Sequence, residues 1–189
     1  MKKQEIKNKI KKENSMKEIE IEKIVLSIGA VGEQLEKAVK LLKVISGMKA
    51  VKTRSKKRIP AFDIRPGLEI GCKVTIRGEK SIVLLKRLLE SINNRLKEKQ
   101  IESNGFSFGI PEYIEIPEME YQRDIGMLGL NVTVAFKRKG KRTEIKKIKR
   151  GKLPRRQYVN KEEIIRLMRE NFKTEIEGKH KPGEEHDSK

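Results

Sequence analysis

The chain has 189 residues, of which 39% are charged and 35% are hydrophobic, and its formal net charge is +19. That length allows one folded domain with polar ends. The single cysteine, Cys72, excludes an intramolecular disulfide and fits a cytoplasmic location. No apolar run approaches the roughly 20 residues of a membrane span or follows the lysine-rich start as in a secretory signal, so we expect no membrane partner.

The positive charge is concentrated in two blocks. Residues 49–58 contain six Lys/Arg and no acid, and residues 137–156 contain twelve Lys/Arg against Glu144 alone. Blocks without interspersed acids repel themselves and attract phosphates, which favours contact with nucleic acid. A membrane-surface role is the alternative, but Gly140, Gly151 and Pro154 interrupt any lipid-facing amphipathic helix in the second block.

Along the chain, residues 1–22 mix Lys and Glu with scattered Ile, which predicts a frayed helix, and residues 1–15 of it form a basic N-terminal arm. The apolar run at 23–29 predicts a strand. Apolar residues spaced three and four apart at 33–46 predict a helix that ends at Gly47.

The second half of the chain shows the same two periods. Alternating apolar residues predict half-buried strands at 69–78 and 130–136. A long apolar stripe predicts a helix at 79–98, and a capping box at Asn160 opens another helix. We expect a single RNA-binding domain over residues 16–175, and a polar stretch from 173 whose disordered tail is residues 176–189.

These elements predict an α+β fold, an open antiparallel β-sheet with α-helices packed mainly on one face. The other face would be polar and mildly basic. Its side chains would be Ser27, Lys73, Thr75, Arg77, Asn131 and Thr133. Such a face either binds a polar ligand or is simply solvated.

The residues for catalysis are missing. The two histidines, His180 and His186, lie in the predicted tail, and Cys72 lies on the apolar side of a strand. The turn at 29–33 lacks the glycine spacing of a nucleotide site. We therefore expect no enzyme activity, no cofactor and no metal. With only 4% aromatic residues for base stacking, the composition favours folded RNA as the partner.

Several motifs together resemble one protein family over residues 16–175. They are "KTRSKK" at 52–57, "IGCKVTIRG" at 70–78, "FSFGI" at 106–110, "YIEIP" at 113–117 and "DIGMLGLNV" at 124–132. They are similar to the large-subunit ribosomal proteins that bind 5S rRNA, family five of the universal nomenclature, in its archaeal–eukaryotic branch.

The resemblance implies a structural protein of the large ribosomal subunit in the cytoplasm. It would bind 5S rRNA and help attach it to large-subunit rRNA in the central protuberance, beside other ribosomal proteins. It would also contact P-site tRNA and bridge to a small-subunit head protein. A non-ribosomal protein that binds structured RNA, or an RNA chaperone, is the alternative.

The resemblance and the polar face together nominate three groups of residues, although Ser27 stands where family members usually carry Asn. The expected rRNA-binding residues are Ser27, Gly29, Lys52, Thr53, Arg54, Lys73, Thr75, Arg77, Asn131 and Thr133. The expected tRNA-contact loop carries Lys56, Lys57, Arg58, Phe62 and Arg65. Further candidates in the second block are Lys137, Arg138, Lys141, Arg142, Lys146, Lys147, Lys149, Arg150, Arg155 and Arg156.

Overall fold

A computed structural model describes residues 15–177. Its main feature is a six-stranded antiparallel sheet in the order β2-β3-β1-β7-β6-β5. The strands are β1 (Ile19–Gly29), β2 (Val51–Arg54), β3 (Glu69–Ile76), β5 (Ile101–Glu102), β6 (Gly105–Ile110) and β7 (Leu130–Arg138). The helices are α2 (Glu33–Ser46), α3 (Glu79–Glu90), α4 (Arg142–Ile145) and α5 (Lys161–Phe172). The predicted α+β class is confirmed.

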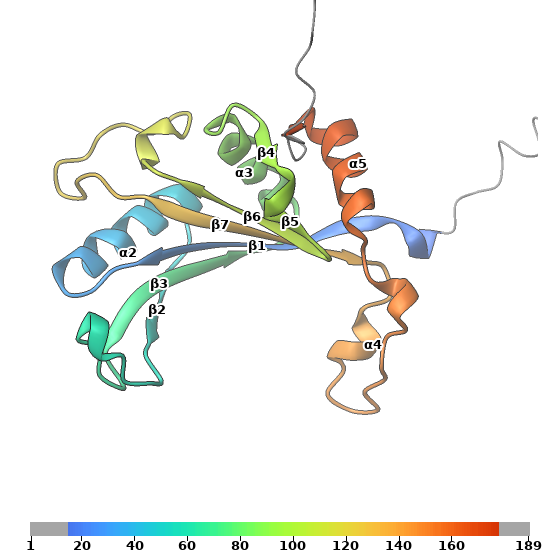
Figure 1. Ribbon diagram of the computed structural model, residues 1–189, viewed down its shortest axis with the longest axis horizontal. Helices are drawn as coiled ribbons and strands as arrows, with labels where there is room; N and C mark the ends of the chain where they lie inside the picture. Colours follow the sequence, from blue (N-terminus) through green and yellow to red (C-terminus); the bar gives the residue numbers. More distant parts are fainter. Residues whose placement is uncertain (1–14, 178–189) are drawn as a thin grey trace, which may run out of the picture.

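The helices α2, α3 and α5 lie on one side of the sheet, and the opposite side carries no helix layer (Figure 1). The strand alternation decides which side is covered. In β7 the inward series Leu130, Val132, Val134 and Phe136 is buried, whereas the outward residues are exposed or half-buried. The core therefore lies between the sheet and the three helices.

Local signals explain why α2 and α5 form. Helix α2 ends where Gly47 adopts a left-handed conformation with φ 65°, as its position predicts. Helix α5 begins with the predicted capping box, in which the side chains of Asn160 and Glu163 each bond the other's backbone N–H. Ile164 and Met168 on its apolar stripe are fully buried.

The helix predicted over 1–22 is wrong where it can be compared. Residues 15–17 form a short 3-10 helix, and β1 begins at Ile19. Ile19 and Ile21 alternate with glutamates, and the strand pairs with β7 from Ile19 onward. Cross-strand pairing therefore outweighs the weak helical preference of the Lys/Glu pattern. Residues 1–14 of the predicted arm (1–15) lie outside the described residues.

Helix α3 is also shorter than the predicted 79–98. Asn93 and Asn94 both adopt positive φ, and the Asn94 N–H donates to the Leu89 carbonyl at 2.9 Å, which closes the helix end. Leu96 is buried instead in β4 (Arg95–Lys97), which pairs in parallel with β8 (Glu175–Glu177). Residues 176 and 177 of the predicted disordered tail therefore belong to a strand, and residues 178–189 lie outside the described residues.

No helix among residues 15–177 is long and apolar enough to cross a membrane. Cys72 is 2% exposed, and burial raises the pKa of its thiol. It is a core residue of β3, as the alternation predicts.

Candidate nucleic-acid interface

The uncovered side of the sheet, here called the open face, carries aligned polar residues on neighbouring strands. Ser27 of β1 lies directly opposite Lys73 of β3 and, on its other side, Asn131 of β7. The next row places Thr75 and Thr133 on either side of Val25. Because directly paired residues share a face, these side chains form one continuous surface.

Most of the predicted rRNA-binding residues are on this face. Thr53 pairs with Gly71, which pairs with Gly29, so these three residues continue the open face toward the β2 edge. Arg77 follows β3 and is exposed. The chain brings eight of the ten together: Ser27, Gly29, Thr53, Lys73, Thr75, Arg77, Asn131 and Thr133.

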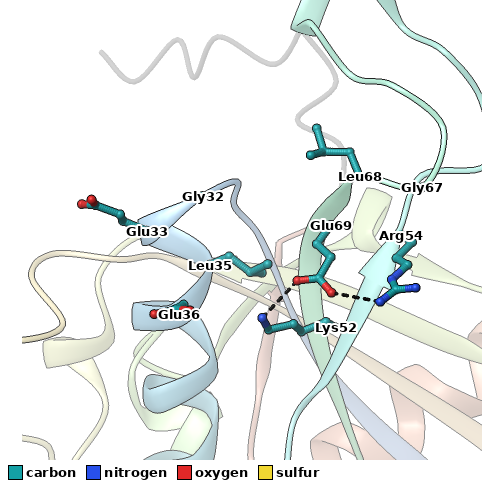
Figure 2. Close-up of a pocket in the computed structure, with 9 residues that line it drawn as sticks. All are labelled: Gly32, Glu33, Leu35, Glu36, Lys52, Arg54, Gly67, Leu68 and Glu69. Carbon is teal, nitrogen blue, oxygen red and sulfur yellow. Dashed lines mark hydrogen bonds and ion pairs between the residues drawn. The ribbon is translucent and has the colours of Figure 1, made fainter.

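The other two, Lys52 and Arg54, are placed differently. Lys52 pairs with the inward residue Cys72 and so lies on the helix side of β2. Figure 2 shows both cations turned toward Glu69, with nitrogen–oxygen distances of 3.0 Å for Lys52 and 3.4 Å for Arg54. The Lys52 hydrogen bond lowers the pKa of the Glu69 carboxyl. The side chains remain accessible to solvent, so these pairs add little stability.

Residues 55–68, here called the basic loop, connect β2 to β3. Ser55 closes its base: the Ser55 N–H donates to the Leu68 carbonyl, and the Gly67 N–H donates to the Ser55 carbonyl, both at 2.8 Å. Near the tip, Ile59 and Ile64 exchange two backbone hydrogen bonds. The five predicted tRNA-contact residues are all exposed: Lys56, Lys57, Arg58, Phe62 and Arg65. The loop is therefore an ordered hairpin that presents cations and a 74% exposed Phe62.

Residues 139–156, here called the basic segment, connect β7 toward α5 and include α4. Cations at its start, and Arg138 just before it, bind acids from distant parts of the chain. The pairs are Arg138 with Glu163 at 2.6 Å, Lys141 with Glu22 at 2.6 Å, and Lys139 with Glu18 and Glu20. The hydrogen bond that the Lys139 ammonium donates to the Glu18 carboxylate raises the pKa of Lys139. The acids that the second block lacks in sequence are thus supplied by β1, its preceding residues and α5.

The remaining cations of the basic segment point to solvent. Within residues 15–177 no acid pairs with the exposed side chains of Arg142, Lys146, Lys147, Lys149, Arg155 and Arg156. Arg150 is exposed too, and its Nε donates to the Glu144 carbonyl at 2.7 Å. Lys137 is half-buried on the open face, where it lies opposite Glu20 in the strand pairing.

The basic loop and the basic segment extend from the same side of the sheet, at opposite ends of the molecule (Figure 1). That side is the open face. The open face therefore lies between two cationic regions, the basic loop and the basic segment, here called the cationic walls. Such a surface can hold a polyanion by contacts with phosphates and sugar hydroxyls.

An acidic surface was missed by the sequence reading, which considered only the basic blocks. Residues 112–124 contain five acids and one arginine. The segment lies at the α2 end, away from α4 along the long axis (Figure 1). Buried Tyr113 holds it in place by accepting a hydrogen bond from the Gln122 N–H at 2.9 Å, and Tyr121 is 55% exposed. The excess of acids in this segment of a strongly basic chain is the sequence feature that could have predicted the acidic surface.

The described residues contain no cluster of three or more His, Cys, Asp or Glu that could hold a metal ion. The groove shown in Figure 2 lies between the start of α2 and the base of the basic loop, with a volume of about 570 Å³. Glu33, Glu36 and Glu69 line it together with the two paired cations.

Comparison with known proteins agrees with the motifs. Residues 69–167 match the C-terminus of the ribosomal L5 family, and residues 14–65 match Ribosomal protein L5. Large ribosomal subunit protein uL5 of Nanoarchaeum equitans is 46% identical over 167 residues, 87% of this chain and 99% of the relative. The uL5 proteins of Sulfolobus acidocaldarius and Methanobrevibacter smithii are 40% and 41% identical, over 88% and 84% of this chain and 95% of each relative. With the motifs, the sheet and both halves of the domain in agreement, this chain belongs to the ribosomal protein L5 family.

Proposed function

We propose that this protein of the large ribosomal subunit binds 5S rRNA through the open face and helps attach it to large-subunit rRNA in the central protuberance. The observation that carries the proposal is the aligned row Lys73–Ser27–Asn131, which lies between two cationic walls. Its ammonium, hydroxyl and amide groups suit phosphates, ribose hydroxyls and base edges of a folded RNA.

The surface also allows the RNA backbone to come close to the sheet. A Cβ atom at Gly29 would meet nothing within 4 Å, and the face is open around it. The glycine leaves room for a sugar or phosphate against the strand. Ser27 offers one hydroxyl rather than the two ends of an amide, so we assign more of the hydrogen bonding to Asn131.

The experiment titrates 5S rRNA with the full-length protein over a range of salt concentrations. We expect tight binding at low salt that weakens steeply as salt rises, because phosphate contacts release counterions. Unlabelled 5S rRNA should compete, and an unrelated structured RNA of similar length should compete far less. Equal competition by both RNAs would replace this proposal with a general RNA-binding or chaperone role.

The basic loop supports a second contact, with P-site tRNA. Its hairpin hydrogen bonds, two prolines and Gly67 at φ 87° hold it in one conformation, which reduces the entropy lost when it docks. Lys56, Lys57 and Arg58 are exposed near its base. They suit the phosphates of a second RNA beyond the edge of the sheet.

Replacing Lys56, Lys57 and Arg58 by Ala should therefore separate the two RNA contacts. We expect the thermal unfolding midpoint to be unchanged and 5S rRNA affinity to fall by no more than about threefold, since only the general field changes. Ribosomes reconstituted with this variant should bind P-site tRNA more weakly than those with the wild-type protein. Loss of folding or of 5S rRNA binding would contradict the assignment of the loop.

The acidic segment at 112–124 supports the third role, a bridge to a small-subunit head protein. Five carboxylates next to exposed Ile114, Tyr121 and Met127 repel RNA but suit a basic protein surface. Its separation from the basic segment along the molecule leaves it free while the open face is occupied.

A further inference from the structure

The basic segment is closed at its base by one ion pair. Arg138 is the last residue of β7, and Glu163 lies in the first turn of α5, so they stand immediately before and soon after the segment. One guanidinium nitrogen of Arg138 donates to both carboxylate oxygens of Glu163, at 2.7 and 2.6 Å. Only 12% of the Arg138 side chain is exposed. The pair therefore joins the two ends of a 24-residue stretch of chain (139–162) between Arg138 and Glu163.

Other contacts keep the same base rigid. The Arg138 side chain also donates to the Lys17 carbonyl at 3.3 Å, which links the residues that precede β1. The Val159 N–H donates to the side-chain oxygen of Asn104 at 2.8 Å, and the Asn104 N–H donates to the Val159 carbonyl at 3.1 Å. These contacts thus fix the point at which the segment leaves the body of the protein.

Strand alternation explains why Arg138 faces this way. It follows Phe136 by two residues, so it continues the inward series of β7 and pairs with Ile19. This placement does not fit the sequence-based prediction that Arg138 contacts RNA. Its guanidinium is half-buried and donates two hydrogen bonds to the Glu163 carboxylate, so it is not available to a phosphate. Its charge is used inside the protein.

We propose that Arg138 and Glu163 are positioning residues for RNA binding: they hold the basic segment so that its free cations bind the same RNA that occupies the open face. This inference rests on the proposed function. The free cations repel one another. Without a fixed base the segment would lose its conformational freedom only when RNA binds, and this entropic cost would lower the affinity for RNA. Because the ion pair already restricts the segment in the folded protein, less conformational entropy is lost when RNA binds.

A matched pair of variants tests the inference against simple electrostatics. Glu163→Gln removes the charge of the pair, yet glutamine still serves the capping box of α5. Glu162→Gln removes one exposed charge from the same helical turn. Removing an acid favours RNA in both variants, so a field effect would strengthen binding in each. We expect E162Q to bind 5S rRNA at least as tightly as wild type, and E163Q to bind about fivefold more weakly, as for residues coupled in one ion-pair network.

A double-mutant cycle separates positioning from general stability. In the second background, Arg142, Lys146, Lys147, Arg155 and Arg156 are replaced by Gln. We expect E163Q to cause little further loss in that background, because most of the free cations of the basic segment have been removed. A loss of equal size in both backgrounds, or wild-type affinity in E163Q, would overturn the inference.

Two further measurements make each outcome decisive. Thermal unfolding shows whether E163Q remains folded at the assay temperature. If E163Q is unfolded, Arg138→Lys is used in the same cycle, because lysine keeps the positive charge but lacks the planar guanidinium. We expect that variant to lose about threefold, within the same range of coupling. Failure of the wild-type protein itself to bind 5S rRNA would reject the proposed function rather than this inference.

Discussion

Replacing Lys73, Arg77 and Asn131 by Ala is expected to weaken 5S rRNA binding by about 100-fold or more, because hydrogen bonds that involve a charged group are each worth about 1.5–3 kcal/mol. All three side chains are exposed, and none is part of the core, so the fold should be kept. The slope of log affinity against log salt should become shallower by about 1.4, that is, about 0.7 for each phosphate that the variant no longer binds.

The control changes the same chemistry on the covered side. Gln34, Lys40 and Lys43 are exposed residues of α2, and replacing them by Ala also removes two cations and one amide. We expect a loss of no more than about threefold from the weaker general field, with an almost unchanged salt slope. Filter binding or fluorescence anisotropy at several salt concentrations compares the two triple variants. Equal losses would mean that the open face is not the RNA surface.

Substituting Gly71 by Ala is expected to lower the free energy of unfolding by about 2 kcal/mol, the usual cost of forcing an extra methyl group into packed structure. A Cβ atom there would lie 2.7 Å from the Ile28 carbonyl oxygen and 3.3 Å from the Thr53 hydroxyl. The Ile28 carbonyl belongs to the backbone and cannot rotate away as a flexible side chain can, so β1 and β3 must shift apart to make room for the methyl group. For a protein of this size the thermal midpoint should fall by about 4–8 °C.

Gly29 provides the matched control, since it lies directly opposite Gly71 in the ladder. Its Cβ would have open space, so Gly29→Ala should change stability by less than about 0.5 kcal/mol. Thermal unfolding followed by circular dichroism measures both variants. Equal stability of G71A and G29A would contradict the close packing of β1 against β3 at Gly71. G29A should instead weaken 5S rRNA binding, because its methyl group projects onto the open face.

The elements that could be predicted from the sequence are those governed by neighbouring residues. Helix α2, its stop at Gly47, the capping box at Asn160 and the alternation of β3 and β7 each depend on a few adjacent side chains. Helix α3 shows the limit: the stripe through Leu85 and Leu89 continues to Leu96 at helical spacing, and only Asn93–Asn94 breaks it. Strand β6 was missed although Phe106 and Phe108 alternate, because six residues carry too weak a signal without their partner.

The candidate site divides in the same way. Alternation alone placed Lys73, Thr75, Asn131 and Thr133 on one face, and the composition alone located the two basic blocks. Which of the cations remain free was decided by acids far away in the chain, such as Glu22 beside Lys141 and Glu163 beside Arg138.

The sequence by itself thus determined the class of partner and the polar face, because charge and period are properties of short stretches. The tertiary structure decided that Lys52, Arg54 and Arg138 bind carboxylates and that both basic regions reach the same side of the sheet. The physical reason is that an ion pair depends on distance in space. Strand pairing and helix packing bring together charges separated by up to 121 residues, and no local pattern records that distance.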